Sequence, residues 1–173
     1  MEIIDDFARF YPAATLIYAL IINDIYLFIF MVLSNSVNGV LKYKIAKPIM
    51  GDKNYPILGK GTRPKGAANC GIWKDPPGHK TKSYGMPSGH SQEAWGFATY
   101  MILKNLSYGY ALYDIRNIIL SGLAVFIMYS RVYLNCHTVQ QVIIGGLFGI
   151  LFGSIGFNMK TPIVSYLTKV FKF

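Results

Sequence analysis

Charged side chains are scarce in this sequence. Lys, Arg, Asp and Glu together make up only 14% of its 173 residues, whereas about a quarter is usual for a soluble domain. Hydrophobic residues make up 53%, and the mean hydropathy is +0.34. This composition excludes an ordinary soluble protein, and the length fits one membrane-embedded domain over residues 1–173.

Cysteine and acidic residues are also few. Cys70 and Cys136 are too few for a disulfide framework, and the sequence leaves open whether these two pair. The eight acidic residues form no cluster near the polar motifs of the chain. Their scarcity there argues against a hydrolase that holds two metal ions between carboxylates. We therefore expect neither a metal nor another cofactor.

Long apolar runs fill much of the chain instead. The longest run free of Lys, Arg, Asp and Glu, Val132–Met159, exceeds the roughly 20 residues that a helix needs to cross a bilayer. Apolar character also extends from Pro12 to about Lys47, as one long helix or as two helices that break near Asn23-Asp24. We expect this break, or a partnered polar pair, to be a structural feature rather than a functional one.

Three further segments complete the predicted bundle. One starts near Glu93, one spans Ile115–Tyr133, and the last runs from Thr138 to about Met159. The sequence therefore predicts an all-α, polytopic membrane bundle of four to five transmembrane helices. Three glycines recur every fourth residue in the last segment, a spacing that allows close helix packing. They are Gly145, Gly149 and Gly153.

The two ends of the chain are shorter and more polar. Residues 1–11 are expected to form a polar lead, whose acidic start lacks the basic region of a secretory signal, so we expect no cleavable signal peptide. Thr161–Phe173 is basic and aromatic and is expected to lie at the membrane surface.

The net charge of +9 is concentrated in one loop. Ten of the seventeen Lys and Arg residues lie between Lys42 and Lys82, against only Asp52 and Asp75. Such a loop, predicted over residues 48–87, attracts anionic lipid or a phosphorylated substrate at a membrane surface. This local concentration does not suggest a nucleic-acid partner. The alternative is a solvated loop, which accounts for most of its lysines.

The stretch Tyr129–His137 combines two side chains suited to a phosphate. Arg131 offers a permanently charged planar fork that matches phosphate oxygens. His137 offers a ring nitrogen that can act as a neutral nucleophile near pH 7. The alternative is an arginine that reaches toward lipid headgroups beside an unrelated loop histidine.

A second polar motif opens the third segment. Pro87, Ser88 and Gly89 stand where a helix is expected to start, and the free N–H groups of a helix start attract anions. Gly89 would let a phosphate approach the backbone, and His90 would face it. A capped helix with an interfacial histidine explains Ser88 but not Gly89 and His90 together. In the loop, Arg63 is a further candidate phosphate contact.

Counting membrane crossings places these residues on one face. The first hydrophobic block ends near Lys42, and the loop keeps Arg63 and His90 on that side. The third segment leaves this face and the fourth returns to it. Arg131 and His137 therefore arrive on the same face as the others.

Three separated pieces of the chain resemble the type 2 phosphatidic acid phosphatase superfamily of membrane lipid phosphatases. The pieces are Lys42 with Arg63-Pro64, then Pro87–His90, and then Ser130-Arg131 with His137. The residues around them are most similar to the dolichyl-diphosphatase branch, and the resemblance covers roughly residues 34–150.

Two positions depart from the pattern of that superfamily. Assigning its lysine to Lys42 requires an insertion before Arg63, and Lys47 and Lys53 remain rivals for this role. Gln141 stands where most of the superfamily has an aspartate, although the dolichyl-diphosphatase branch is similar to this chain in having a glutamine here. Glutamine can orient the ring of His137 but cannot stabilise a cationic ring as a carboxylate does.

The resemblance implies a metal-independent, two-step phosphoryl transfer without a cofactor. His137 would be the nucleophile, His90 the general acid and base, and Gln141 the orienting residue. The phosphate would be held by Lys42, Arg63, Ser88, Gly89 and Arg131.

The implied substrate is a polyprenyl diphosphate of the dolichyl type in a multi-pass protein of the endoplasmic reticulum or a related internal membrane. Alternatives are a phosphatase for phosphatidate or another lipid phosphate, or a non-catalytic protein that binds anionic membrane lipids. The sequence leaves open the oligomeric state and the compartment that the active face sees.

Overall fold

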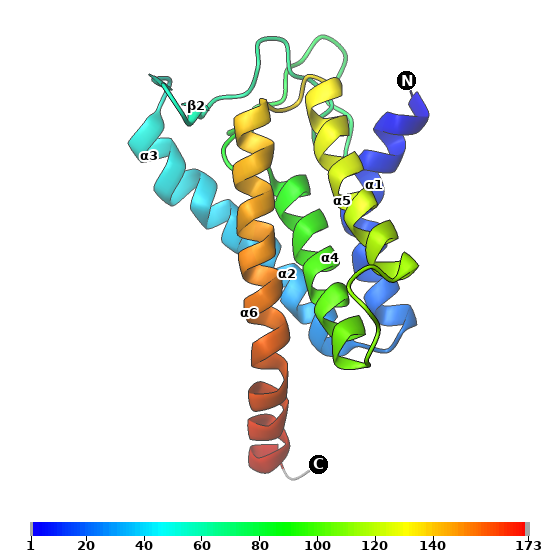
Figure 1. Ribbon diagram of the computed structural model, residues 1–173. Coiled ribbons are helices and arrows are strands. Elements are labelled where there is room, and N and C mark those ends of the chain that lie inside the picture. Colours follow the sequence, from blue (N-terminus) through cyan, green and yellow to red (C-terminus); the bar gives the residue numbers. More distant parts are fainter. Residues whose placement is uncertain (1, 172–173) are drawn as a thin grey trace.

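Five long helices lie side by side in the computed structural model, which describes residues 2–171 (Figure 1). They are α1 (Glu2–Ile21), α2 (Ile25–Val40), α4 (Gly89–Ser107), α5 (Ile115–Tyr133) and α6 (Val139–Phe171). A π-helical stretch, η1 (Leu41–Ala46), and the short α3 (Lys47–Met50) continue α2. Figure 1 shows the N-terminus and the long loop at one end of the bundle and the C-terminus at the other.

The predicted all-α membrane bundle is confirmed. Among the described residues, three helices are long and apolar enough to cross a membrane: Ile25–Met50, Ile115–Tyr133 and Val139–Val170. Helices α1 and α4, of 20 and 19 residues, run alongside them. The loop between α3 and α4 holds two short antiparallel strands, β1 (Asn54–Tyr55) and β2 (Gly59–Lys60).

Helix α4 is the central helix of the bundle. It packs against each of the other four long helices, so its side chains meet protein rather than lipid. This position explains why Ser91, Gln92 and Glu93 can be buried in its first turns, since polar groups inside a membrane protein face the bundle interior. The phosphate-binding motif predicted at residues 87–90 opens this helix.

The first prediction that the structure contradicts concerns residues 1–11. Residues 2–11 form no polar lead, because α1 begins at Glu2; residue 1 lies outside the described part of the chain. Ala8 and Tyr11 pack into a core cluster with residues of α4 and α5. Arg9 is also buried and pairs with Asp5 one turn earlier, so the charge that makes this segment look exposed is satisfied within the helix itself.

The apolar block before residue 47 is two helices, not one. The chain breaks at Ile22–Asp24, and the carboxylate of Asp24 caps α2 by accepting from the Leu27 backbone N–H at 3.1 Å. Lys104 and Lys160 donate to the same carboxylate at 2.8 and 2.9 Å. Asp24 therefore has a structural role, as a partnered polar group at a helix break.

Three other boundaries differ from the prediction. The loop begins at Gly51 rather than at residue 48, because η1 and α3 prolong α2. Helix α4 reaches Ser107, so Lys104 belongs to the helix. Residues 161–171, predicted as a short tail, instead continue α6 through Pro162, and their place at the membrane surface stays a prediction. One proline removes a single backbone hydrogen bond, which a long helix tolerates. Residues 172–173 lie outside the described part of the chain.

The glycines of the last segment form a close contact with α4, as their spacing indicated. A Cβ atom built on Gly145, Gly149 or Gly153 would lie 2.4, 2.4 or 2.6 Å from a backbone oxygen of the Ser88–Gly96 stretch. Real side chains do not approach a carbonyl oxygen so closely. Glycine at these positions lets α6 rest directly on the backbone of α4.

We therefore expect Gly149→Ala to lower the melting temperature by several degrees, because overpacking a close helix contact costs about 1–3 kcal/mol. The measurement is thermal unfolding of the detergent-purified protein. Gly122→Ala is the matched control, since a Cβ atom there meets nothing within 4 Å and alanine favours a helix. Equal melting temperatures for the two variants would show that the glycine contact is not needed.

Candidate active site

His137 lies in the short turn between α5 and α6, where it is 2% exposed. Its Nδ1 is 2.9 Å from Oε1 of Gln141. The amide nitrogen of Gln141 donates to the carbonyls of Lys60 and Thr62 at 2.9 and 2.7 Å, which fixes the amide oxygen as the group that faces the ring. Nδ1 therefore carries the proton, and Nε2 carries a lone pair.

Arg63 lies against this lone pair. Its Nη1 is 3.0 Å from Nε2 of His137 and donates to the carbonyl of Cys136 at 2.8 Å. Its Nε and Nη2 donate to the carbonyl and hydroxyl of Ser83 at 2.9 and 2.8 Å. The guanidinium is thus held on three sides by neutral groups. Burial lowers the pKa of Arg63 to about 10, so the group remains charged at neutral pH.

The surroundings of His137 favour its neutral form. Burial lowers the pKa of His137 well below its usual value, and the positive charges of Arg63 and Lys42 lower it further. A ring that stays neutral at and below neutral pH keeps its nucleophilic nitrogen available. The geometry therefore presents an unprotonated Nε2 beside a fixed cation.

A cavity opens beside His137 and Arg63, and Lys42 lines it as well. Lys42 is 9% exposed. It follows Asn38 by one helical turn, and Asn38 donates to Gln92 of α4 at 2.8 Å. Gln92 in turn donates to Ser34 of α2 at 2.9 Å. This buried network holds the end of α2 against the start of α4. By contrast, the rival lysines, Lys47 and Lys53, are exposed.

The second motif forms the start of α4. Ser88 is fully buried, and its Oγ caps the helix, 3.4 Å from the Ser91 backbone nitrogen and 2.9 Å from the Ser91 hydroxyl. A Cβ atom on Gly89 would lie 3.0 Å from Oδ1 of Asn38, so glycine lets α2 come close. Gly89 lines the cavity, whereas Ser88 lies behind it.

His90 lines the cavity too, and it is oriented by α1. Its ring hydrogen-bonds to the backbone of Arg9, while its Nε2 has no hydrogen-bond partner within residues 2–171. One ring nitrogen is therefore fixed, and the other is free to exchange a proton with a bound group.

Arg131 is fully buried next to the cavity. Its Nη2 donates to the carbonyl of Cys70 at 3.0 Å, and its Nε and Nη1 find no partner among the described residues. Cys70 and Cys136 form a disulfide, a pairing that the sequence left open. The bridge joins the loop to the turn that carries His137.

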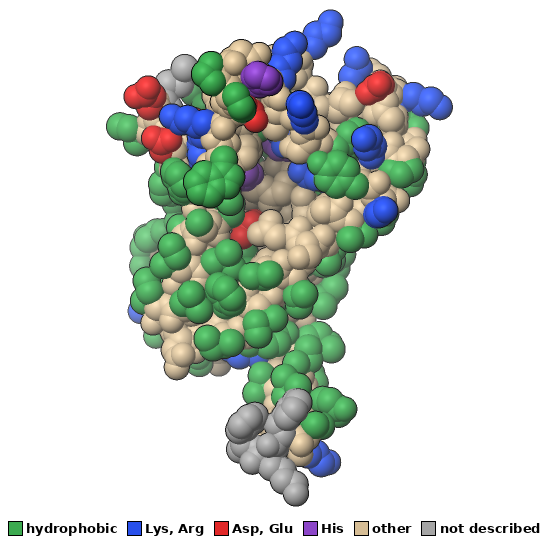
Figure 2. Space-filling view, turned by 180° about the vertical axis from the view of Figure 1, so that it is seen from behind, with side chains coloured by type: hydrophobic (Ala, Val, Ile, Leu, Met, Phe, Trp, Pro, Cys, Tyr) green, Lys and Arg blue, Asp and Glu red, His purple; other side chains and the backbone are tan. Residues whose placement is uncertain are grey.

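The cavity has a volume of about 310 Å³. Of the predicted site residues, the structure brings Lys42, Arg63, Gly89, His90 and His137 to its wall. Arg63 and Ser83 also border a second, outer cavity of about 640 Å³ that is rich in lysine. Figure 2 shows Lys and Arg side chains gathered at this end of the molecule, above a hollow and a broad hydrophobic face.

Sequence reasoning missed Ser83, Arg9 and Glu93 in this site. Glu93 lines the cavity, accepts from Asn35 at 2.7 Å, and leaves its Oε1 without a partner among the described residues. An acidic residue inside an apolar segment was the available signal. Ser83 and the backbone of Arg9 act through tertiary contacts, which no local pattern reveals.

Taken together, these groups can bind a phosphate through fixed cations and attack it with a neutral imidazole. Within residues 2–171, no group of three or more His, Cys, Asp or Glu residues is placed to hold a metal ion. The side chains around His137 include the cations Arg63 and Lys42 instead.

Known proteins are similar to this chain over part of their length. Lipid phosphate phosphatase gamma of Arabidopsis thaliana is 44% identical over 80 residues, which is 43% of this chain and 35% of that protein. Dolichyldiphosphatase 1 of Dictyostelium discoideum is 35% identical over 107 residues, 59% of this chain and 44% of that protein. Dolichyldiphosphatase 1 of Rhinolophus ferrumequinum is 32% identical over 149 residues, 79% of this chain and 52% of that protein.

The chain thus spans between about a third and about half of the length of these relatives. No solved structure matches it significantly. The sequence profile of the PAP2 superfamily matches residues 24–164. This range includes the candidate site residues Lys42, Arg63, His90, Arg131 and His137. The resemblance seen in the sequence is therefore confirmed, and the chain belongs to the PAP2 superfamily.

Proposed function

We propose that this protein is an integral membrane phosphatase that hydrolyses a polyprenyl diphosphate of the dolichyl type or a related lipid phosphate. The observation that carries the proposal is the neutral Nε2 of His137, which Gln141 orients and which lies 3.0 Å from Nη1 of Arg63. A nucleophile beside fixed cations, in a cavity at one end of a membrane bundle, suits an anionic lipid headgroup.

In the first step, Nε2 of His137 attacks the phosphorus, and the bond from phosphorus to the leaving lipid oxygen breaks. Lys42, Arg63 and Arg131 stabilise the charge on the phosphoryl oxygens. His90, which takes up a second proton at Nε2 when the anionic headgroup binds, donates that proton to the leaving oxygen, so that the lipid leaves as a neutral hydroxyl or a protonated phosphate. The product of this step is a phosphohistidine at His137.

In the second step, a water molecule attacks the phosphohistidine. His90, now neutral, accepts a proton from this water, and the bond between phosphorus and Nε2 breaks. Inorganic phosphate leaves, and both histidines return to their starting states. Splitting the reaction into two displacements replaces one high barrier by two lower ones.

Metal independence is part of the proposal, and the charge of the site supports it. Lys42, Arg63 and Arg131 already supply the positive charge that a metal ion would supply to a phosphate. A divalent cation would also be repelled by them. Only Glu93 contributes a carboxylate to the cavity wall, and one carboxylate is a poor site for Mg²⁺.

The disulfide supports a location for this face. Disulfides persist in oxidising compartments and are rare in the cytosol, so we place the Cys70–Cys136 end of the bundle in such a compartment, for example the lumen of the endoplasmic reticulum. Counting basic residues alone would place the lysine-rich loop in the cytoplasm. Here the same lysines would attract an anionic substrate, so their number does not indicate that the loop is cytoplasmic.

His137→Ala should lower kcat by at least about a thousandfold, because it removes the nucleophile. The measurement is phosphate release by detergent-purified protein from dolichyl diphosphate, phosphatidate and other lipid phosphates, with EDTA present. His79→Ala is the matched control, because His79 is exposed in the loop. Near wild-type turnover in His137→Ala would refute the nucleophile, and a loss in EDTA that magnesium restores would refute metal independence.

Lys42→Ala should lower kcat/KM by roughly a hundredfold or more, the loss expected for one preorganised charge contact. Lys47→Ala and Lys53→Ala should each cost only a few-fold, through weaker attraction of the anionic substrate, and added salt should remove that difference. If Lys53→Ala is the crippling change and Lys42→Ala the mild one, Lys42 is not the phosphate contact.

Gln141→Glu should lower kcat roughly tenfold or more, although most of the superfamily has an acid here. A carboxylate would place an oxygen against the carbonyls of Lys60 and Thr62, where the amide now donates, and such unmatched buried groups are costly. Gln140→Glu is the control, since it adds the same charge at an exposed neighbour. Higher activity in Gln141→Glu would show that the carbonyl contacts do not position His137.

A further inference from the structure

The disulfide joins the two backbone segments that hold the arginines of the site. Nη2 of Arg131 donates to the carbonyl of Cys70 at 3.0 Å, and Nη1 of Arg63 donates to the carbonyl of Cys136 at 2.8 Å. The two cysteines are 66 residues apart in sequence. Each arginine therefore donates to the backbone of one half of the bridge, and in each case the cysteine that accepts is far from the arginine in sequence.

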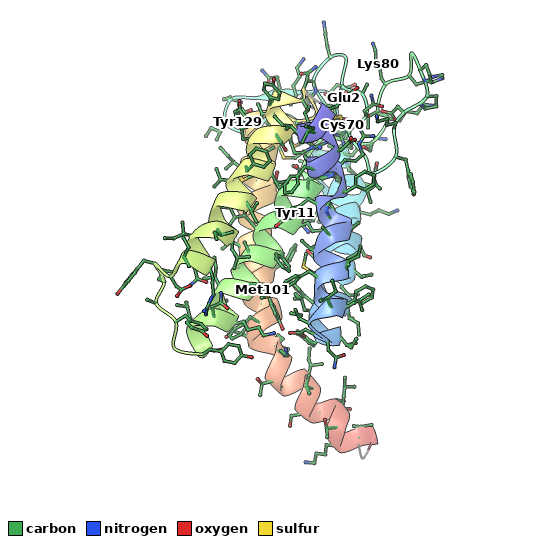
Figure 3. The ribbon with its side chains drawn as sticks, turned by 90° about the vertical axis from the view of Figure 1, so that its right-hand side faces the viewer. Glu2, Tyr11, Cys70, Lys80, Met101 and Tyr129 are labelled. Atoms are coloured by element: carbon green, nitrogen blue, oxygen red, sulfur yellow. A yellow bond between two sulfur atoms is a disulfide. The ribbon has the colours of Figure 1, made fainter. Side chains whose placement is uncertain are left out.

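The two halves are anchored differently. Cys136 belongs to a turn tied to the end of α5, because the backbone N–H groups of Cys136 and His137 both donate to the carbonyl of Arg131, at 2.9 and 3.0 Å. Cys70 belongs to the loop, and residues 71–74 that follow it are exposed. Its own N–H donates to Thr81 at 3.2 Å, another loop residue. Figure 3 shows Cys70 at the loop end of the bundle.

Among the described residues, the side chain of Arg131 has the Cys70 carbonyl as its one hydrogen-bond partner, whereas Arg63 also donates to Ser83. Within residues 2–171, no ion pair involves Arg63 or Arg131; the ion pairs there belong to other basic residues. Without the bridge, the carbonyl of Cys70 would be positioned by loop contacts alone. A loop contact is weaker and less rigid than a covalent link to a helix end.

We propose that the Cys70–Cys136 disulfide positions Arg131 and Arg63 for phosphate, so that phosphate binding and turnover depend on its redox state. This inference rests on the proposed function for its effect on turnover. The cysteines act as positioning residues, since they reach the phosphate only through the arginines. A dithiol reagent opens the bridge by supplying two electrons and two protons. The protein is left with two thiols, and the reagent becomes a cyclic disulfide.

The experiment compares oxidised and dithiothreitol-reduced protein, purified in detergent and checked for free thiols by alkylation and mass spectrometry. Reduction should lower kcat/KM about tenfold or more, as when a charge-assisted hydrogen bond loses its geometry. Reoxidation should restore it. Cys70→Ser/Cys136→Ser should match the reduced protein and should not respond to dithiothreitol. Unchanged kcat/KM in fully reduced wild type would overturn the proposal, even if the double variant fails to fold.

A second measurement separates positioning from general loosening of the fold. In Arg131→Lys, which cannot reproduce the planar fork, reduction should cost clearly less than in the wild type, because one of the two groups that the bridge positions is already lost. Equal fold-changes in both proteins would show that the bridge acts elsewhere and would overturn the inference. All assays are run well below the melting temperature of the reduced protein.

Binding of inorganic phosphate, measured by isothermal titration calorimetry, keeps this inference distinct from the proposed function. Reduction should weaken phosphate binding about tenfold. If the oxidised protein binds phosphate, loses affinity for it on reduction, and hydrolyses no lipid phosphate, the proposed function fails while this inference holds. If reduction leaves phosphate affinity unchanged, this inference fails whatever the turnover.

Discussion

Positive charge on Lys42, Arg63 and Arg131 is gathered around one small cavity, and the structure depends on how that charge is held. Like charges in a region of low dielectric repel one another, and each also loses its hydration. No described carboxylate forms an ion pair with them. Backbone carbonyls and a serine hydroxyl bind the two arginines instead. A site of this kind gains most from an anion with several oxygens, which supplies the missing negative charge.

The position of His137, the proposed nucleophile, follows from a second constraint, which is centred on Gln141. The side chain of Gln141 connects His137 to the loop at residues 60–62. The backbone carbonyl of Gln141 accepts from the Ser88 backbone N–H at 3.0 Å. One residue of α6 thus fixes the histidine turn, the basic loop and the start of α4 relative to one another. Gly85 makes room for it, since a Cβ atom there would lie 2.6 Å from the Gln141 amide oxygen. The proposed phosphate contacts, which come from distant parts of the chain, can therefore share one geometry.

The elements with a strong local signal could be predicted from the sequence. Ile115–Tyr133 is a helix with the predicted bounds, and the glycine spacing of α6 identified its packing face. Counting crossings placed the motif residues at one end, where the structure has most of them around a cavity. The start of α1 was missed because the burial of Arg9 depends on its pairing with Asp5 and on packing against α4 and α5. The sequence left the disulfide open because two cysteines far apart in sequence carry no local signal of their pairing.

Among the described residues, buried polar groups have partners at one end of the bundle, and several lack them at the other. At the far end, the carboxylate of Asp24 accepts from both Lys104 and Lys160 and caps a helix as well, so the charges there have partners. At the loop end, Arg131 keeps two donors without partners among the described residues, and Nε2 of His90 is likewise free. Unsatisfied buried donors are costly unless something binds them. Because the same fold satisfies such groups elsewhere, the unsatisfied set at the loop end is best explained by a ligand, and its donors match the oxygens of a phosphate.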